Sequence, residues 1–170
     1  MAKTLIVYYS MSGNTEWAAE RIAGCIGADL LRLKPRKAYP SKGFRKFLWG
    51  GKSAVMAEAP ALEPYSFDSA AYERIIFGFP VWAGTFAPPL RSFVKEAFAG
   101  ASPEDLRFAA FACQSGSGAE KAFAKLSALL ARPLEATLVL IDPKDRPAAE
   151  NELKISGFCA AMGEPDIIVC

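Results

Sequence analysis

Residues 4–15, with the sequence TLIVYYSMSGNT, decide the fold. The first six, Thr4–Tyr9, are apolar, β-branched or aromatic without a break, which is typical of a strand covered on both faces. The next residues place Gly13 among hydroxyl and amide side chains. They lead into 14–26, where apolar residues recur at helical spacing. A buried strand that turns into a helix through small polar residues is the first part of a β–α–β unit.

The rest of the chain repeats this alternation. Four further stretches are predicted as strands, namely 28–33, 74–79, 106–113 and 134–141. Pro88, a Ser117–Glu120 capping box and Pro147 each predict the start of a helix, and Gly163 predicts the end of the last one.

This order predicts an α/β fold with three layers, in which helices cover both faces of a doubly wound sheet. The sheet has five parallel strands in the order 2-1-3-4-5, and residues 1–170 form a single domain. Residues 35–69 are too long for a simple connection. A short helix is expected within them at 44–49.

The loop that follows the first strand is suited to a phosphate group. Hydroxyl groups, an amide and successive backbone N–H groups meet there at the start of a helix, whose partial positive charge attracts anions. The loop contains no lysine or arginine, and GxxxxGK[ST] is absent, which favours a monophosphate held by neutral donors over a triphosphate. A helix N-cap without a ligand is the alternative interpretation.

Two segments resemble the flavodoxin family. Residues 6–15, IVYYSMSGNT, with Ala19 four residues on, are similar to that family's FMN-phosphate pattern. Residues 78–85, GFPVWAGT, resemble a second flavodoxin segment, G-x-P-[VI]-W-x-G-T, and Pro88-Pro89 follows them here as it does in the family. The spacing of the strands agrees as well, so the resemblance covers essentially the whole chain.

The resemblance implies FMN as the cofactor and a site built from three loops. The phosphate would be bound by Ser10, Ser12, Asn14 and Thr15, with the amides of Met11 and Gly13. The second loop would contribute Trp82 against the isoalloxazine ring and Gly84 as a backbone partner of flavin N5. The complete second set is Pro80, Val81, Trp82, Ala83, Gly84 and Thr85.

The third loop would reach the pyrimidine edge of the flavin through Cys113, Gln114, Ser115 and Gly116. It has no Tyr or Trp to cover the outer flavin face, which departs from the common carrier pattern. That face is either open or covered by an aromatic residue from elsewhere, with Tyr39, Phe44, Phe47 and Trp49 as candidates. Cys113 is expected to be a buried strand-end cysteine without a catalytic role.

Composition restricts the chemistry. Histidine is absent and the four cysteines lack metal-ligand spacing, so we expect neither a His-based triad nor a metal site. No apolar run approaches the roughly 20 residues of a membrane span, and no signal peptide is recognised. A cytoplasmic protein with reduced thiols is expected.

One segment is strongly basic. Between Lys34 and Lys52 lie seven basic residues and no acid, and the remaining sequence carries 13 basic and 18 acidic residues, a net charge of −5. A solvated loop, a docking surface for an acidic redox partner and a site for the 2′-phosphate of NADPH are the three interpretations. Nucleic-acid binding has no other support in the chain.

The resemblance leaves two functions open. The first is an FMN-dependent electron-transfer carrier in redox metabolism. The alternative is an NAD(P)H-dependent FMN or quinone reductase on the same fold, so the partner is either a redox protein or NAD(P)H. A net charge of +2 is unusual for a flavodoxin carrier and weakens the first reading. A cofactor-free interaction domain is disfavoured by the two motifs. The sequence leaves the oligomeric state open between monomer and dimer.

Overall fold

Five parallel strands form the sheet of the computed structural model, which describes residues 3–39, 58–99 and 101–163. Their order across the sheet is β2-β1-β3-β5-β6. All adjacent pairs are parallel, so their carboxyl ends meet at one edge. The predicted fold class is therefore confirmed, and the predicted strand order holds for these five strands. The strands are β1 (Thr4–Tyr8), β2 (Asp29–Arg32), β3 (Arg74–Trp82), β5 (Arg107–Gln114) and β6 (Thr137–Ile141).

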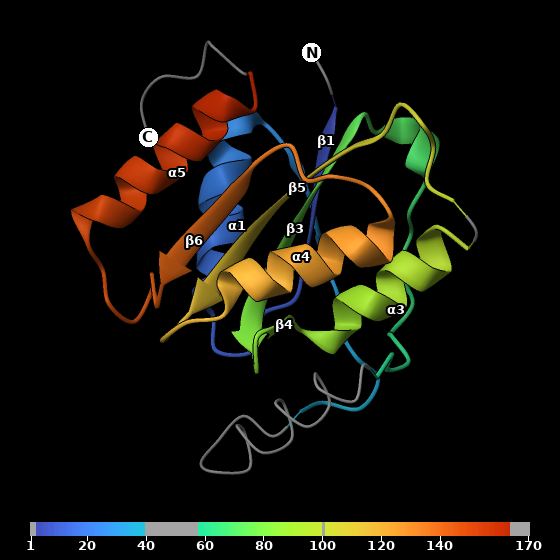
Figure 1. Cartoon of the computed structure of the whole chain (residues 1–170), viewed down its shortest axis with the longest axis horizontal. Coiled ribbons are helices and arrows are strands. Elements are labelled where there is room, and N and C mark those ends of the chain that lie inside the picture. The colour runs from blue at the N-terminus through green and yellow to red at the C-terminus, as the bar shows by residue number, and fades with distance from the viewer. Residues whose placement is uncertain (1–2, 40–57, 100, 164–170) are drawn as a thin grey trace.

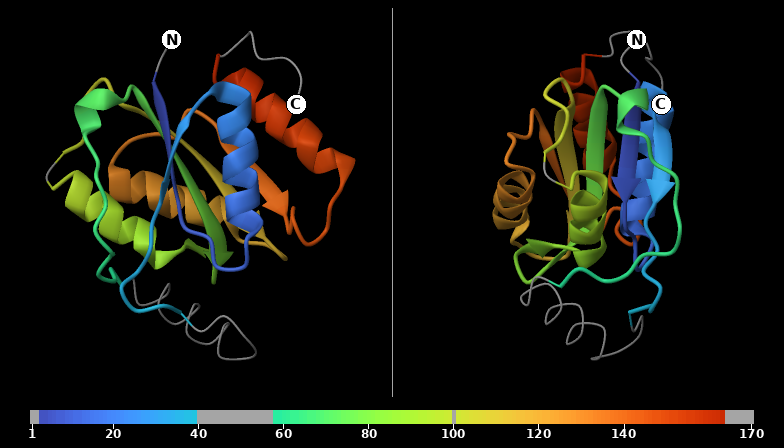
Figure 2. Two further views of the ribbon diagram at one scale, coloured as in Figure 1. Left: turned by 180° about the vertical axis from the view of Figure 1, so that it is seen from behind. Right: turned by 90° about the vertical axis from the view of Figure 1, so that its right-hand side faces the viewer.

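Helices cover both faces of the sheet. Figure 1 shows α3 and α4 in front of it, and Figure 2, seen from behind, shows α1 and α5 on the opposite face. The two faces have separate apolar cores, one under α3 and α4 and one under α1 and α5. The helices are α1 (Asn14–Ile26), α3 (Pro88–Ala97), α4 (Ala119–Leu130) and α5 (Ala149–Ala161), with a short 3₁₀ helix η1 at Ser69–Ala71.

A short additional strand is the main difference from the predicted sheet. β4 (Thr85–Phe86) pairs antiparallel with the end of β3, which runs three residues beyond its predicted end at Phe79. Ala83 and Gly84 form the two-residue turn, and both have positive φ, 50° and 66°. This is the pattern of a type I′ hairpin, so Trp82 lies at a strand end and not in an irregular loop.

Two predicted helix starts are wrong. The Ser117–Glu120 capping box does not form, because Gly118 is the N-cap of α4 and no N-cap side chain bonds there. The Gln114 carboxamide oxygen instead accepts from the Ala119 N–H at 3.0 Å. The last helix begins at Ala149 and not at Pro147. Its predicted stop is confirmed, because Met162 is the C-cap and Gly163 follows it with a φ of 71°.

The ends of the long excursion 35–69 are held together. Pro35 and Leu62 form an antiparallel bridge, flanked by hydrogen bonds from the Arg36 N–H to Ala61 O and from the Glu63 N–H to Lys34 O. The short helix expected at 44–49 lies outside the described residues, as do Phe44, Phe47 and Trp49.

The cysteines differ in state. Cys113 and Cys159 are free and buried, in agreement with the expectation of reduced thiols. Cys25 is disulfide-bonded, so the expectation is wrong at that position. Within the described ranges, no helix has both the length and the apolar composition needed to cross a membrane.

Candidate functional site

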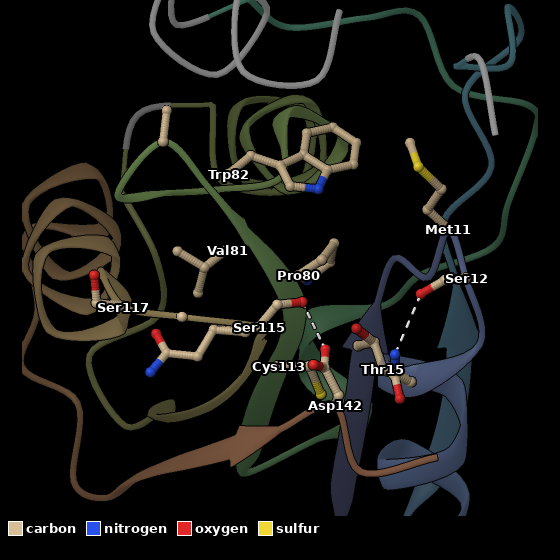
Figure 3. A pocket seen from close by; sticks show the side chains of 14 residues that line it. Met11, Ser12, Thr15, Pro80, Val81, Trp82, Cys113, Ser115, Ser117 and Asp142 are labelled. Atoms are coloured by element: carbon tan, nitrogen blue, oxygen red, sulfur yellow. Dashed lines mark hydrogen bonds between the residues drawn. The ribbon is translucent and has the colours of Figure 1, made fainter. Parts of the chain in front are cut away.

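A cavity of about 340 Å³ lies at the carboxyl edge of the sheet. It opens between the loops that follow β1, β5 and β6 and the end of β3 (Figure 3). Fourteen residues line it, and twelve of them are among the sixteen predicted from sequence. These twelve are Met11, Ser12, Asn14, Thr15, Pro80, Val81, Trp82, Ala83, Cys113, Gln114, Ser115 and Gly116.

Four predicted residues do not line the cavity. Ser10 is buried, and its hydroxyl accepts from the N–H groups of Gly13 and Glu16, both at 3.2 Å. The Thr85 hydroxyl accepts from Lys125 Nζ at 2.7 Å, on the side of α4. Gly13 forms the N-cap of α1, and Gly84 forms the turn between β3 and β4. These four residues therefore stabilise the conformation of the first and second loops and do not face the cavity.

Two cavity residues were missed by the sequence analysis. Ser117 belongs to the third loop but was interpreted as a helix cap. Asp142 follows β6 and is positioned by a hydrogen bond from the Ser115 hydroxyl at 2.7 Å (Figure 3). Its N–H donates to Gln114 O at 3.1 Å. Neither motif extends to β6, so no local pattern pointed to Asp142.

The first loop keeps a row of unpaired donors. Within the described part of the chain, the backbone N–H groups of Met11, Ser12, Asn14 and Thr15 have no hydrogen-bond partner. All four residues line the cavity. Free N–H groups in the loop before a thirteen-residue helix and in its first turn form an arrangement that binds anions.

Asn14 already has partners. Its Nδ2 donates to Asp145 Oδ2 at 2.9 Å and to the Ser12 hydroxyl at 3.4 Å. Its Oδ1 accepts from the N–H groups of Lys144 at 2.8 Å and Asp145 at 3.2 Å. The Asn14 side chain therefore ties the β6–α5 loop to the first loop, and its backbone N–H remains available for a ligand.

Trp82 forms one wall of the cavity. Its indole ring makes edge-to-face contacts with Tyr9, at a centroid distance of 5.7 Å, and with Tyr39, at 5.2 Å. Tyr39 also contacts Tyr9 at 6.1 Å, so the three rings support one another. Burial, followed by the neighbouring Tyr39, raises the pKa of Tyr9 and keeps its phenol neutral. Figure 3 shows Trp82 on the side opposite Asp142 and Cys113.

The third loop also presents free backbone donors. Among the described residues, the N–H groups of Ser115, Gly116 and Ser117 have no partner. The loop is placed by a close approach of two glycines, because a Cβ on Gly118 would lie 3.0 Å from the Gly84 Cα. A side chain at position 118 would therefore push the third loop away from the β3–β4 turn.

Cys113 is not suited to nucleophilic chemistry. Burial raises the pKa of its thiol to about 12, although a hydrogen bond with the Thr15 side chain acts in the opposite direction. At neutral pH the thiol is protonated, and the thiolate is the reactive form. The structure therefore agrees with the expectation of a structural cysteine.

Comparison with known proteins points to one family. A family model described as Flavodoxin matches residues 3–134. Among solved structures, a flavoprotein in complex with FMN from Lactobacillus acidophilus NCFM is 21% identical, with a TM-score of 0.70, and the match covers 85% of this chain and 96% of that one. Oxidised Flavodoxin 2 from Bacillus cereus is 20% identical, with a TM-score of 0.63, and the match covers 96% of this chain and 99% of that one. At these identities the solved structures support the fold.

Proposed function

Because this chain belongs to the flavodoxin family, we propose that it binds FMN in the cavity at the carboxyl edge of the sheet and acts as an electron-transfer carrier. The observation that carries the proposal is the row of unpaired N–H groups on Met11, Ser12, Asn14 and Thr15, which belong to residues lining that cavity. A phosphate monoester is close to a dianion at neutral pH, and such donors suit it.

The remaining residues also fit a flavin. The Trp82 wall offers an aromatic surface, and the free N–H groups of 115–117 suit the polar pyrimidine edge. FMN, when bound, supplies reversible redox chemistry. The chain's own residues would bind and orient it, and the Trp82–Tyr9–Tyr39 ring cluster would fix the aromatic wall.

A reductase that accepts hydride from NAD(P)H is the second candidate. It is favoured by one feature of the third loop, where residues 113–118 include no aromatic side chain that could cover a flavin face. A nicotinamide needs such an uncovered face. We place the carrier first because neither family motif specifies a nicotinamide site.

Partner and location belong to the proposal as well. A redox partner protein would dock near the exposed cavity, and the basic segment 34–52 offers charge for an acidic one. We also propose a cytoplasmic location, which the free Cys113 and Cys159 thiols support.

The phosphate assignment predicts selectivity for FMN over riboflavin. The purified protein should bind one FMN per chain and bind riboflavin much more weakly. Thr15→Val, which keeps the side-chain shape and removes the hydroxyl, should weaken FMN binding by about 1–3 kcal/mol through a lost hydrogen bond. Titration calorimetry or quenching of flavin fluorescence measures both affinities.

The matched control for Thr15→Val is Thr137→Val. Thr137 is exposed at the start of β6, away from the cavity, and the substitution should leave FMN affinity unchanged. Equal affinity of the wild type for FMN and riboflavin would contradict a phosphate site at residues 10–15.

Mixing with reduced nicotinamides separates carrier from reductase. For a carrier, we expect the flavin absorbance of the loaded protein to persist for minutes after anaerobic addition of NADH or NADPH, and to disappear on addition of dithionite. Stopped-flow measurement of the visible flavin absorbance follows this loss. Bleaching within seconds by either nucleotide would establish the reductase instead.

A further inference from the structure

The loop after β6 folds back over the start of α1. Asn14, only 7% exposed, holds this loop by accepting from the N–H groups of Lys144 and Asp145 and by donating to the Asp145 carboxylate. The loop also closes on itself, since the Arg146 N–H donates to Asp142 O at 2.7 Å. The backbone of Lys144 is thus fixed beside the first loop, although 130 positions separate it from Asn14.

The Lys144 side chain lies over Gly13. A Cβ on Gly13 would be 2.7 Å from Lys144 Nζ, 3.3 Å from its Cδ and 3.6 Å from its Cε. Gly13 also has a φ of +99°, a conformation that other residues rarely adopt. The missing side chain at position 13 therefore leaves room for the lysine ammonium beside the loop.

The nearby carboxylates have other partners. Asp142 accepts from the Ser115 hydroxyl and pairs with Arg146, Asp145 accepts from Asn14, and Glu16 in the first turn of α1 pairs with Arg32. Among the residues that the structure describes, no carboxylate lies within ion-pair distance of Lys144. A side chain 130 positions away thus brings a positive charge to a loop that contains none in its own sequence.

We infer that Lys144 supplies the positive charge that recognises the phosphate monoester at residues 10–15, and that it thereby sets the preference of this site for FMN over riboflavin. The inference rests on the proposed FMN site and adds a residue to it. Neutral N–H donors leave the charge of a phosphate dianion uncompensated, and an ammonium beside Gly13 attracts that charge through space. Riboflavin carries no phosphate, so its binding should not depend on Lys144.

The test compares two flavins on Lys144→Gln, which keeps a polar side chain and part of the aliphatic stem but removes the charge. FMN affinity should fall roughly 10- to 100-fold, the effect of losing one hydrogen bond to a charged group. Riboflavin affinity should stay within about twofold on the same grounds. The FMN affinity of the wild type should also decrease more steeply with added salt than that of Lys144→Gln, because salt screens exposed charges.

Two control variants isolate the charge. Lys144→Arg keeps the cation and should retain most of the preference for FMN. Lys154→Gln removes one positive charge from the outer surface of α5, where Lys154 pairs with Glu150, and should leave both affinities unchanged. Thermal unfolding of the apoproteins checks that every variant is folded.

The outcomes test the role of Lys144 and the FMN site separately. If the wild type prefers FMN and Lys144→Gln keeps the same FMN-to-riboflavin ratio, the role of Lys144 is overturned and the FMN site stands. A variant that loses affinity for both flavins equally also overturns it, because the lysine then acts through packing. A wild type that binds neither flavin, or both equally, overturns the proposed function itself.

Discussion

Replacing Glu135 with leucine is expected to lower the free energy of unfolding by about 3–5 kcal/mol, because it leaves a guanidinium without its counter-ion in the interior. Arg74, at the start of β3, is 2% exposed. Its Nε donates to Glu135, and its Nη2 donates to Met162 O at 2.9 Å. Its Nη1 is buried, and the described residues offer it no partner. Urea unfolding measures the loss through the transition midpoint.

An exposed ion pair provides the control for Glu135. Arg21 and Glu152 pair at 3.3 Å with nearly half of each side chain exposed, so Glu152→Leu should change stability by less than about 1 kcal/mol. Adding Arg74→Met to Glu135→Leu removes the stranded charge and should restore much of the loss. If Glu135→Leu and Glu152→Leu lower the free energy of unfolding equally, the ion pair of the buried Arg74 contributes no more to stability than an exposed pair.

Gly78→Ala is expected to destabilise the centre of the sheet by about 2–3 kcal/mol through overpacking. Gly78 lies in β3 with Tyr8 and Phe111 as its register partners on either side. A Cβ at this position would lie 2.2 Å from Cζ of the Phe111 ring, which is fully buried under α1 and α5. The ring has no room to move, because packed interiors contain few voids. Thermal or urea unfolding measures the effect.

A second substitution identifies the clash as the cause. Phe111→Leu alone should cost about 1–2 kcal/mol as a cavity forms, but added to Gly78→Ala it should recover stability. Gly24→Ala is the matched control. A Cβ there meets nothing within 4 Å and Gly24 lies inside α1, so the change should be neutral or stabilising by up to about 1 kcal/mol. Simple additivity of the Gly78 and Phe111 changes would rule out the clash.

Patterns of neighbouring residues were enough to predict most of the residues that line the cavity. The apolar run of β1, the glycine-containing turn and the helical spacing of α1 are patterns of neighbouring residues, and the predicted helix at 14–26 coincides with the observed one. The second motif likewise placed Trp82 at the cavity. Parallel strands bring their carboxyl ends to one edge of the sheet. Two motifs that each follow a strand therefore lie together at that edge.

Boundaries and caps depended on long-range contacts. β3 continues to Trp82 because a hairpin pairs its last residues with Thr85 and Phe86, a pairing that apolar periodicity does not reveal. The start of α4 is set by Gly118 and by the Gln114 side chain, since the close approach of Gly118 to Gly84 places the turn. Ser117 is therefore not the N-cap of α4, and it lines the cavity instead.

The sequence by itself determined the layered fold, the strand order and the loops that surround the cavity, because hydrophobic periodicity and turn chemistry act over a few neighbouring residues. Only the tertiary structure decided which distant side chains join them. Asp142 reaches the cavity through hydrogen bonds with Ser115 and Gln114. Lys144 reaches Gly13 because the Asn14 carboxamide binds the loop after β6. That contact depends on the path of the folded chain, which no local pattern near residue 14 or residue 144 contains.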